Sequence, residues 1–188
     1  MRFHCGVCGQ DHDELPDIGA DYPDHWFLVP EAERERRVEY CADACAVDGE
    51  AFYIRGVIRI PVHDHPEPFG WGVWVSQKKE NFGEYMKAFD SAEIGPFFGW
   101  LSTSIAYYLP DATTHLKTKA HFQGNGLRPV IELEPSDHPL AAHQRDGVSL
   151  TTAWDFVHFA MLPREERQKR IDARRPAKNA KPKRKERK

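Results

Sequence analysis

The sequence predicts an α+β domain with a mainly antiparallel sheet flanked by helices and a zinc-knuckle-like segment at its N-terminus. Three observations favour this class. Hydrophobic residues make up 40% of the 188 residues, which suits a single domain with its own core. Strand-like stretches follow one another across short turns, whereas a parallel α/β fold would alternate strand and helix. Two closely spaced cysteines open the chain.

The first half of the chain is expected to form a helix, two strands and a second helix. Pro30 suits the first turn of a helix and acidic residues follow it, so residues 29–45 are expected to be helical. Residues 51–62 and 69–76 have the alternation of strands. Residues 77–90 carry aromatic residues at helical spacing and are expected to form the second helix.

The second half is expected to add three strands and a closing helix. Residues 95–105 are strand-like, and residues 114–123 and 127–135 alternate on either side of a Gly-Asn-Gly turn, which predicts a hairpin. Residues 149–162 form an amphipathic helix. Its expected apolar stripe is Leu150, Trp154, Val157 and Met161.

The charge pattern divides the chain into a domain over residues 1–162 and a basic tail over residues 163–188. From residue 164 onward there are thirteen basic and four acidic residues, so the rest of the chain is strongly acidic. Ile171 is the single large aliphatic residue of the tail, which is therefore expected to be mostly disordered. Such a tail would bind nucleic acid nonspecifically, because it has no aromatic residue to stack on bases. Alternatively, it would act as a solubilising segment or fold back on the acidic body.

The compartment is expected to be the cytoplasm. No apolar run approaches the roughly 18 residues of a membrane-spanning helix, and the N-terminus lacks the apolar centre of a signal peptide. We therefore expect no membrane contact. Cysteines in a reducing compartment indicate metal binding, catalysis or burial more than disulfides.

The four cysteines predict a structural zinc site. Cys5 and Cys8 have the C-x2-C spacing of a metal knuckle, and zinc takes about four thiolate or imidazole ligands. In the expected first helix, Cys41 and Cys45 are four residues apart and would share one face. His12 is the rival fourth ligand. The alternative is that Cys41 and Cys45 pack as small hydrophobic residues. A site with four protein ligands leaves no open position for water, so it would fasten the N-terminus to the first helix.

Other polar and aromatic residues have two interpretations. His63, His65, His138 and Asp137 are acid/base candidates for a hydrolase, although a solvated turn accounts for the first two and a helix N-cap at Asp137 for the last. The Gly-Trp pairs of residues 69–76 and 96–101 could hold a ring, or pack in the core. No complete catalytic motif is present.

Several stretches together resemble a bacterial family catalogued as domain of unknown function 2199. They include "CGVCGQDHDELP", "CAVDGEAFYIRG", "FGWGVWVS" and "HLKTKAHFQGNGLRPVIELEPSDHPLAAHQRDGVSL". The resemblance spans roughly residues 3–160 and implies no activity. It implies that Cys5, Cys8, His12 and Cys45 follow the family pattern. Cys41 departs from it, which favours His12 as the fourth ligand.

The sequence therefore leaves three functions open. The first is a zinc-stabilised binding or adaptor domain that meets a protein partner through its aromatic or acidic surface. The second is a metal-dependent or acid/base hydrolase, and the third is a nucleic-acid-associated protein that acts through its basic tail.

Overall fold

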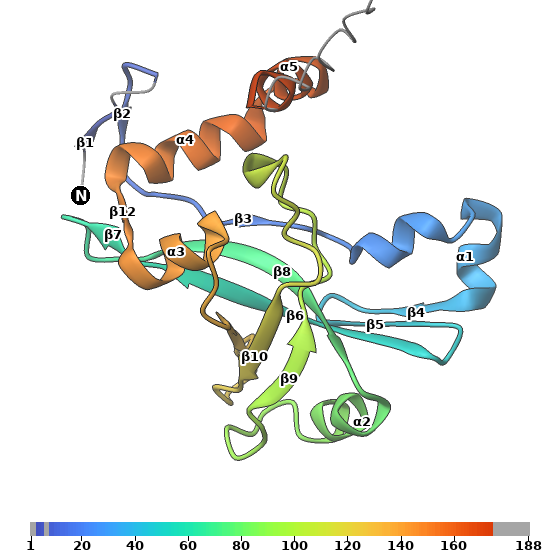
Figure 1. Cartoon of the computed structure of the whole chain (residues 1–188). Helices are drawn as coiled ribbons and strands as arrows, with labels where there is room; N and C mark the ends of the chain where they lie inside the picture. Colours follow the sequence, from blue (N-terminus) through green and yellow to red (C-terminus); the bar gives the residue numbers. More distant parts are fainter. Residues whose placement is uncertain (1–2, 6–7, 175–188) are drawn as a thin grey trace, which may run out of the picture.

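A computed structural model describes residues 3–5 and 8–174 (Figure 1). The helices of this part are the 3-10 turns η1 (Asp24–Leu28) and η2 (Ala106–Tyr108) and the α-helices α1 (Glu31–Arg37), α2 (Lys79–Lys87), α3 (Pro139–Asp146), α4 (Leu150–Met161) and α5 (Arg164–Arg174). The strands are β1 (Phe3–His4), β2 (Asp11–His12), β3 (Ile18–Gly19), β4 (Val38–Tyr40), β5 (Ala44–Val47), β6 (Ala51–Ile60), β7 (Val62–His63), β8 (Phe69–Gln77), β9 (Phe97–Trp100), β10 (Lys117–His121), β11 (Val130–Leu133) and β12 (Val148–Ser149). The predicted α+β class is confirmed.

The main sheet is mixed, although most of its pairs are antiparallel. Its strand order is β3-β8-β6-β11-β10-β9, and β4 and β5 extend it beside β6. The pairs β6–β8 and β10–β11 are antiparallel, as the turns predicted, but β11 runs parallel to β6 and β3 runs parallel to β8. A bridge between Val75 and Leu101 brings the end of β9 back to β8, so the sheet curls.

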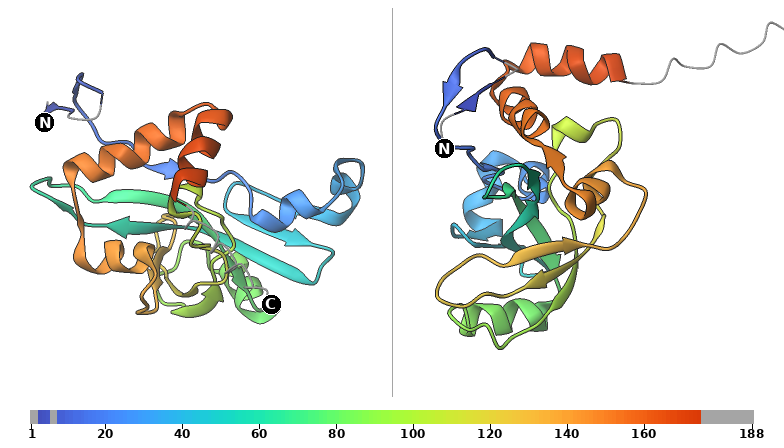
Figure 2. Two further views of the ribbon diagram at one scale, coloured as in Figure 1. Left: turned by 45° about the horizontal axis from the view of Figure 1, so that its top comes forward. Right: turned by 90° about the vertical axis from the view of Figure 1, so that its left-hand side faces the viewer.

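The core lies between this curled sheet and the helices α3 and α4 (Figures 1 and 2). Phe69, Trp71, Val73 and Val75 are all buried, as the alternation of β8 predicted, and Trp74 on the other face is also fully buried. Both faces of β8 are therefore covered, and its tryptophans are packing residues. No helix in the described part of the chain is long and apolar enough to span a bilayer.

The expectation of one helix over residues 29–45 is wrong. Helix α1 ends at Arg37, where the chain turns into the antiparallel pair β4–β5. Cys41 lies at the turn, with its N–H donated to the carbonyl of Ala44, and Cys45 pairs with Tyr53 of β6. The β-branched and aromatic residues after Arg37 favour a strand, and edge pairing with β6 satisfies their backbone groups.

The chain after the predicted closing helix also differs from expectation. Residues Arg164–Arg174 form helix α5, where the sequence predicts a mostly disordered tail. Ile171 is buried, and Arg174 lies over the rings of Tyr107 and Phe159 and donates to the Tyr107 carbonyl. These contacts offset the ordering entropy that composition alone suggested the segment could not recover. The disorder predicted for residues 175–188 falls outside the described residues.

Helix α4 presents most of its predicted stripe to the core, because Trp154 and Val157 are buried and Leu150 packs against the core cluster. Met161 is 74% exposed, whereas Phe156 and Phe159 are buried with Trp154 and Val157. The helix is apolar around most of its circumference, so hydrophobic periodicity did not identify Phe156 and Phe159 as core residues.

Candidate metal centre

The N-terminal segment forms a small hairpin that presents two cysteines and a histidine. Strands β1 and β2 are antiparallel, with Phe3 opposite His12 and His4 opposite Asp11. The Cys5 N–H donates to the carbonyl of Gln10 at 2.8 Å, and the Gly9 N–H donates to the carbonyl of Cys5 at 2.8 Å. Gly9 has φ of +71°, a conformation that a residue with a Cβ adopts at a cost. The backbone thus holds the cysteine loop closed.

Four potential ligand atoms converge at this hairpin. The sulfurs of Cys5 and Cys8 and one ring nitrogen each of His12 and His158 all lie within 4.8 Å of one another. The Cys8 Sγ is 3.2 Å from His12 Nε2. A tetrahedral zinc with ordinary Zn–S and Zn–N bonds places its ligand atoms about 3.3–3.8 Å apart. A small inward movement of the side chains would therefore complete the geometry, and the donor set suits zinc.

His158 is the member of this group that the sequence did not single out. It comes from α4, and its Nδ1 is buried with no hydrogen-bond partner in the described part of the chain. A buried imidazole nitrogen without a partner is costly, and metal coordination through Nδ1 would remove this cost. Trp154 lies one turn earlier on α4, and its ring stacks on His12 with centroids 3.8 Å apart and planes 19° apart.

The group joins two parts of the molecule that are distant in sequence. Figure 2 shows the N-terminal hairpin beside the C-terminal helices. Cys5 is 1% exposed and packs in the main core cluster, whereas Cys8 is exposed. The expectation that the site joins the N-terminus to the first helix is not what the structure shows, because the partner of the hairpin is α4.

The structure places Cys41 and Cys45 away from this group. Cys45 is fully buried in a second cluster with Val29, Val47 and Trp74, and burial raises the pKa of its thiol to about 11. Cys41 is exposed. Their four-residue spacing predicted a shared helix face, but Cys41 lies at an exposed turn and Cys45 lies in the buried strand β5. Of the predicted ligands, the structure brings together Cys5, Cys8 and His12. None of the four cysteines is in a disulfide.

The acid/base candidates are engaged in separate local contacts. His63 Nε2 donates to the carbonyl of Asp146 at 3.0 Å, and His65 Nδ1 lies 2.8 Å from the carbonyl of Glu67. The N-cap of α3 is His138 and not the predicted Asp137, because His138 Nδ1 accepts from the Leu140 N–H at 3.0 Å. These contacts are those of turn residues and of a helix N-cap.

A different cleft collects titratable groups that the sequence did not single out. It is lined by Asp24, His25, Tyr53 and His115 and has a volume of about 400 Å³. The Tyr53 hydroxyl is hydrogen bonded to His25 Nδ1 at 2.7 Å, and burial raises the pKa of Tyr53 to about 12. Burial also raises the pKa of Asp24, which accepts the Ser104 N–H. The side chains of Asp24, His25 and Tyr53 are thus each held in a structural contact.

The fold and the cysteine–histidine group define an α+β domain with a possible Cys2His2 metal centre. Its sequence matches a family described as "Uncharacterized protein conserved in bacteria (DUF2199)" over residues 4–148. The chain belongs to this family, which confirms the resemblance. Cys5, Cys8 and His12 lie inside the matched range and His158 lies beyond it. Neither the comparison with curated proteins nor that with solved structures finds a match.

Proposed function

We propose that this chain is a zinc-stabilised binding domain whose metal is held by Cys5, Cys8, His12 and His158. The observation that carries the proposal is the convergence of these four side chains from the hairpin and α4. Four protein ligands leave no position for a reacting water, so the metal is structural. Its role is to fasten the hairpin to α4.

The position of the site supports a structural role. From His12 the chain continues into β3, which joins the sheet through its pairing with β8. On the other side of the site, His158 is followed by the buried Phe159 of α4. A metal here therefore fixes the spacing between the edge of the sheet and the helix that covers it. A binding domain needs such a fixed spacing, because a preorganised surface reduces the ordering cost of binding.

The test is the metal content of purified protein with two matched variants. Cys8→Ser and Cys41→Ser each replace one exposed cysteine. We expect about one zinc per chain in the wild type and in Cys41→Ser, and loss of zinc in Cys8→Ser. Equal zinc content in both variants would contradict the ligand set, and a folded wild type without zinc would contradict the proposal.

The other two functions have less support. The hydrolase hypothesis required its acid/base residues to converge, and the contacts of His63, His65 and His138 are separate. Part of the basic tail lies outside the described residues, so nucleic-acid binding stays a prediction. Deletion of residues 175–188 tests it, because tail-driven binding would be lost and would depend steeply on salt.

A protein partner also stays a prediction. The strand β9 offers Phe98 and Trp100, each 41% exposed, whereas the aromatic residues of β8 are buried. Of the two Gly-Trp stretches that the sequence singled out, the one in β9 therefore keeps exposed aromatic side chains.

A further inference from the structure

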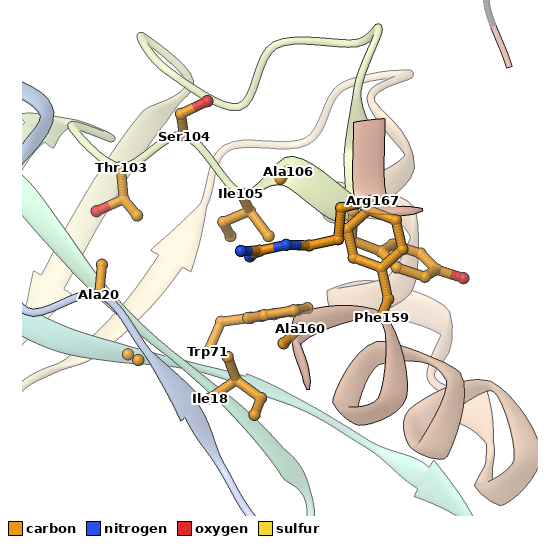
Figure 3. Close-up of a pocket in the computed structure, with 13 residues that line it drawn as sticks. Ile18, Ala20, Trp71, Thr103, Ser104, Ile105, Ala106, Phe159, Ala160 and Arg167 are labelled. Carbon is orange, nitrogen blue, oxygen red and sulfur yellow. The ribbon is translucent and has the colours of Figure 1, made fainter. Parts of the chain in front are cut away.

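A pocket lies between the sheet edge and the C-terminal helices. Strands β3 and β8 form its floor, the segment around η2 forms one wall, and α4 and α5 form the other (Figure 3). Its apolar lining includes Ile18, Trp71, Ile105, Tyr107 and Phe159. The pairing of Gly19 with Gly72 leaves backbone, without side chains, at part of the floor.

One cation points into this apolar space. Figure 3 shows the guanidinium of Arg167 reaching from α5 into the pocket between Ile105 and Trp71. The neighbouring cations of α5 are engaged, since Arg170 pairs with Asp155 and Arg174 contacts the Tyr107 carbonyl. Among residues 3–5 and 8–174, no acidic side chain forms an ion pair with Arg167.

An unpaired guanidinium in a largely apolar pocket favours an anionic ligand. Arg167 is half-buried, and a charge that is partly removed from water is stabilised by an opposite charge and hydrogen bonds. The planar guanidinium binds a carboxylate through two parallel hydrogen bonds. The apolar walls then suit the body of the ligand, because most of a ligand pocket is apolar and a few polar groups fix the orientation.

The volume restricts the size of the ligand. The cavity measures about 180 Å³, and an apolar cavity of about 150 Å³ is large enough for benzene. One ring with a carboxylate fills such a volume, whereas a nucleotide is larger than it. The single cation also favours a monoanion over a phosphate dianion.

We propose that this pocket binds a small aromatic monocarboxylate, with Arg167 holding the carboxylate and the walls around Trp71 and Phe159 enclosing the ring. The proposal names the ligand class of the binding domain proposed above and rests on that role, but Arg167 is not part of the metal centre. The two sites are linked through the chain, because His158 precedes Phe159 and the hairpin leads into β3.

The experiment is a calorimetric titration of the full, zinc-loaded chain with benzoate and with benzamide, its neutral analogue. Arg167→Gln removes the cation, and Arg164→Gln removes an exposed cation of the same helix as the matched control. Ala160→Leu narrows the pocket without changing its charge. Circular dichroism and zinc content are measured on every sample, so that a damaged fold or metal centre is recognised.

The expected result is saturable binding of benzoate, at least about tenfold weaker binding of benzamide, and a loss of at least about tenfold in Arg167→Gln. Arg164→Gln should bind as the wild type does, and Ala160→Leu should bind weakly. Equal binding of benzoate and benzamide, or unchanged binding in Arg167→Gln, would overturn the proposal. Absence of benzoate binding by folded, zinc-loaded wild type would also overturn it, while leaving the proposed metal centre standing.

Discussion

Replacement of His158 by alanine separates metal binding from packing at the N-terminal hairpin. In the proposed metal centre, His158 is the ligand that comes from α4. Its loss should leave the two cysteines and His12 without their fourth ligand. Loss of a partner that only orients a metal ligand weakens metal binding by about 10–100-fold. We expect loss of the ligand itself to cost at least as much.

Weaker zinc binding lowers the free energy of unfolding directly. Each tenfold increase in the dissociation constant lowers the free energy of unfolding at a fixed excess of zinc by about 1.4 kcal/mol, so the expected loss is about 1.4–2.7 kcal/mol or more. After chelation the metal contribution is absent from both proteins. The difference between wild type and His158→Ala should then fall to a small packing effect, because His158 is only partly buried.

The assay is urea unfolding of both proteins with excess zinc and with a chelator. His4→Ala is the matched control, since His4 is an exposed histidine of the same hairpin and is outside the group. We expect its effect to be the same in both conditions. An equal destabilisation of His158→Ala with zinc and with chelator would refute the reasoning, because it would make His158 a packing residue.

Three further predictions follow from burial and charge. Zinc should protect the exposed Cys8 from alkylation but not the exposed Cys41, and chelation should remove the difference, as peptide mass mapping would show. Burial lowers the pKa of His143 from its ordinary 6.5, so the unfolded chain takes up its proton first and stability falls as pH falls from about 7.5 to about 5.5. His143→Gln should lose less stability over this range in chelator. Ile171→Ala should cost about 2 kcal/mol in thermal unfolding, because Ile171 is 5% exposed, whereas Met161→Ala should change little.

Each of these predictions has a clear contrary result. Equal alkylation of the two cysteines in zinc would count against the metal centre. Parallel pH profiles of wild type and His143→Gln would show that this histidine does not contribute. An unchanged melting temperature for Ile171→Ala would mean that α5 does not pack as described.

The sequence predicted the parts of the fold that rest on local signals. The alternation of β8 and the turn at residues 124–126 depend on neighbouring residues, and both the buried face and the β10–β11 hairpin are confirmed. The parallel pairing of β11 with β6 depends on a long-range approach that alternation cannot specify. The segment after Arg37 shows the same limit, because its charged and β-forming residues suit a helix or a strand until β6 is beside it.

Three of the four residues of the candidate site could be predicted from the sequence. Cys5, Cys8 and His12 are close in the chain, so spacing was enough to suggest them. His158 is distant, and its signal was a histidine one turn after Trp154 on a helix that is otherwise mostly apolar. The family match over residues 4–148 does not reach it. Cys45 could not be excluded in advance, since a buried thiol and a metal ligand look alike in sequence.

The most direct test of the account is X-ray absorption spectroscopy at the zinc edge on the purified, zinc-loaded protein. The ligand set Cys5, Cys8, His12 and His158 predicts two sulfurs at about 2.3 Å and two imidazole nitrogens at about 2.0–2.1 Å. A shell of four sulfurs would contradict it and would indicate that Cys41 and Cys45 are ligands. A shell of nitrogen and oxygen alone would contradict any role for the cysteine pair.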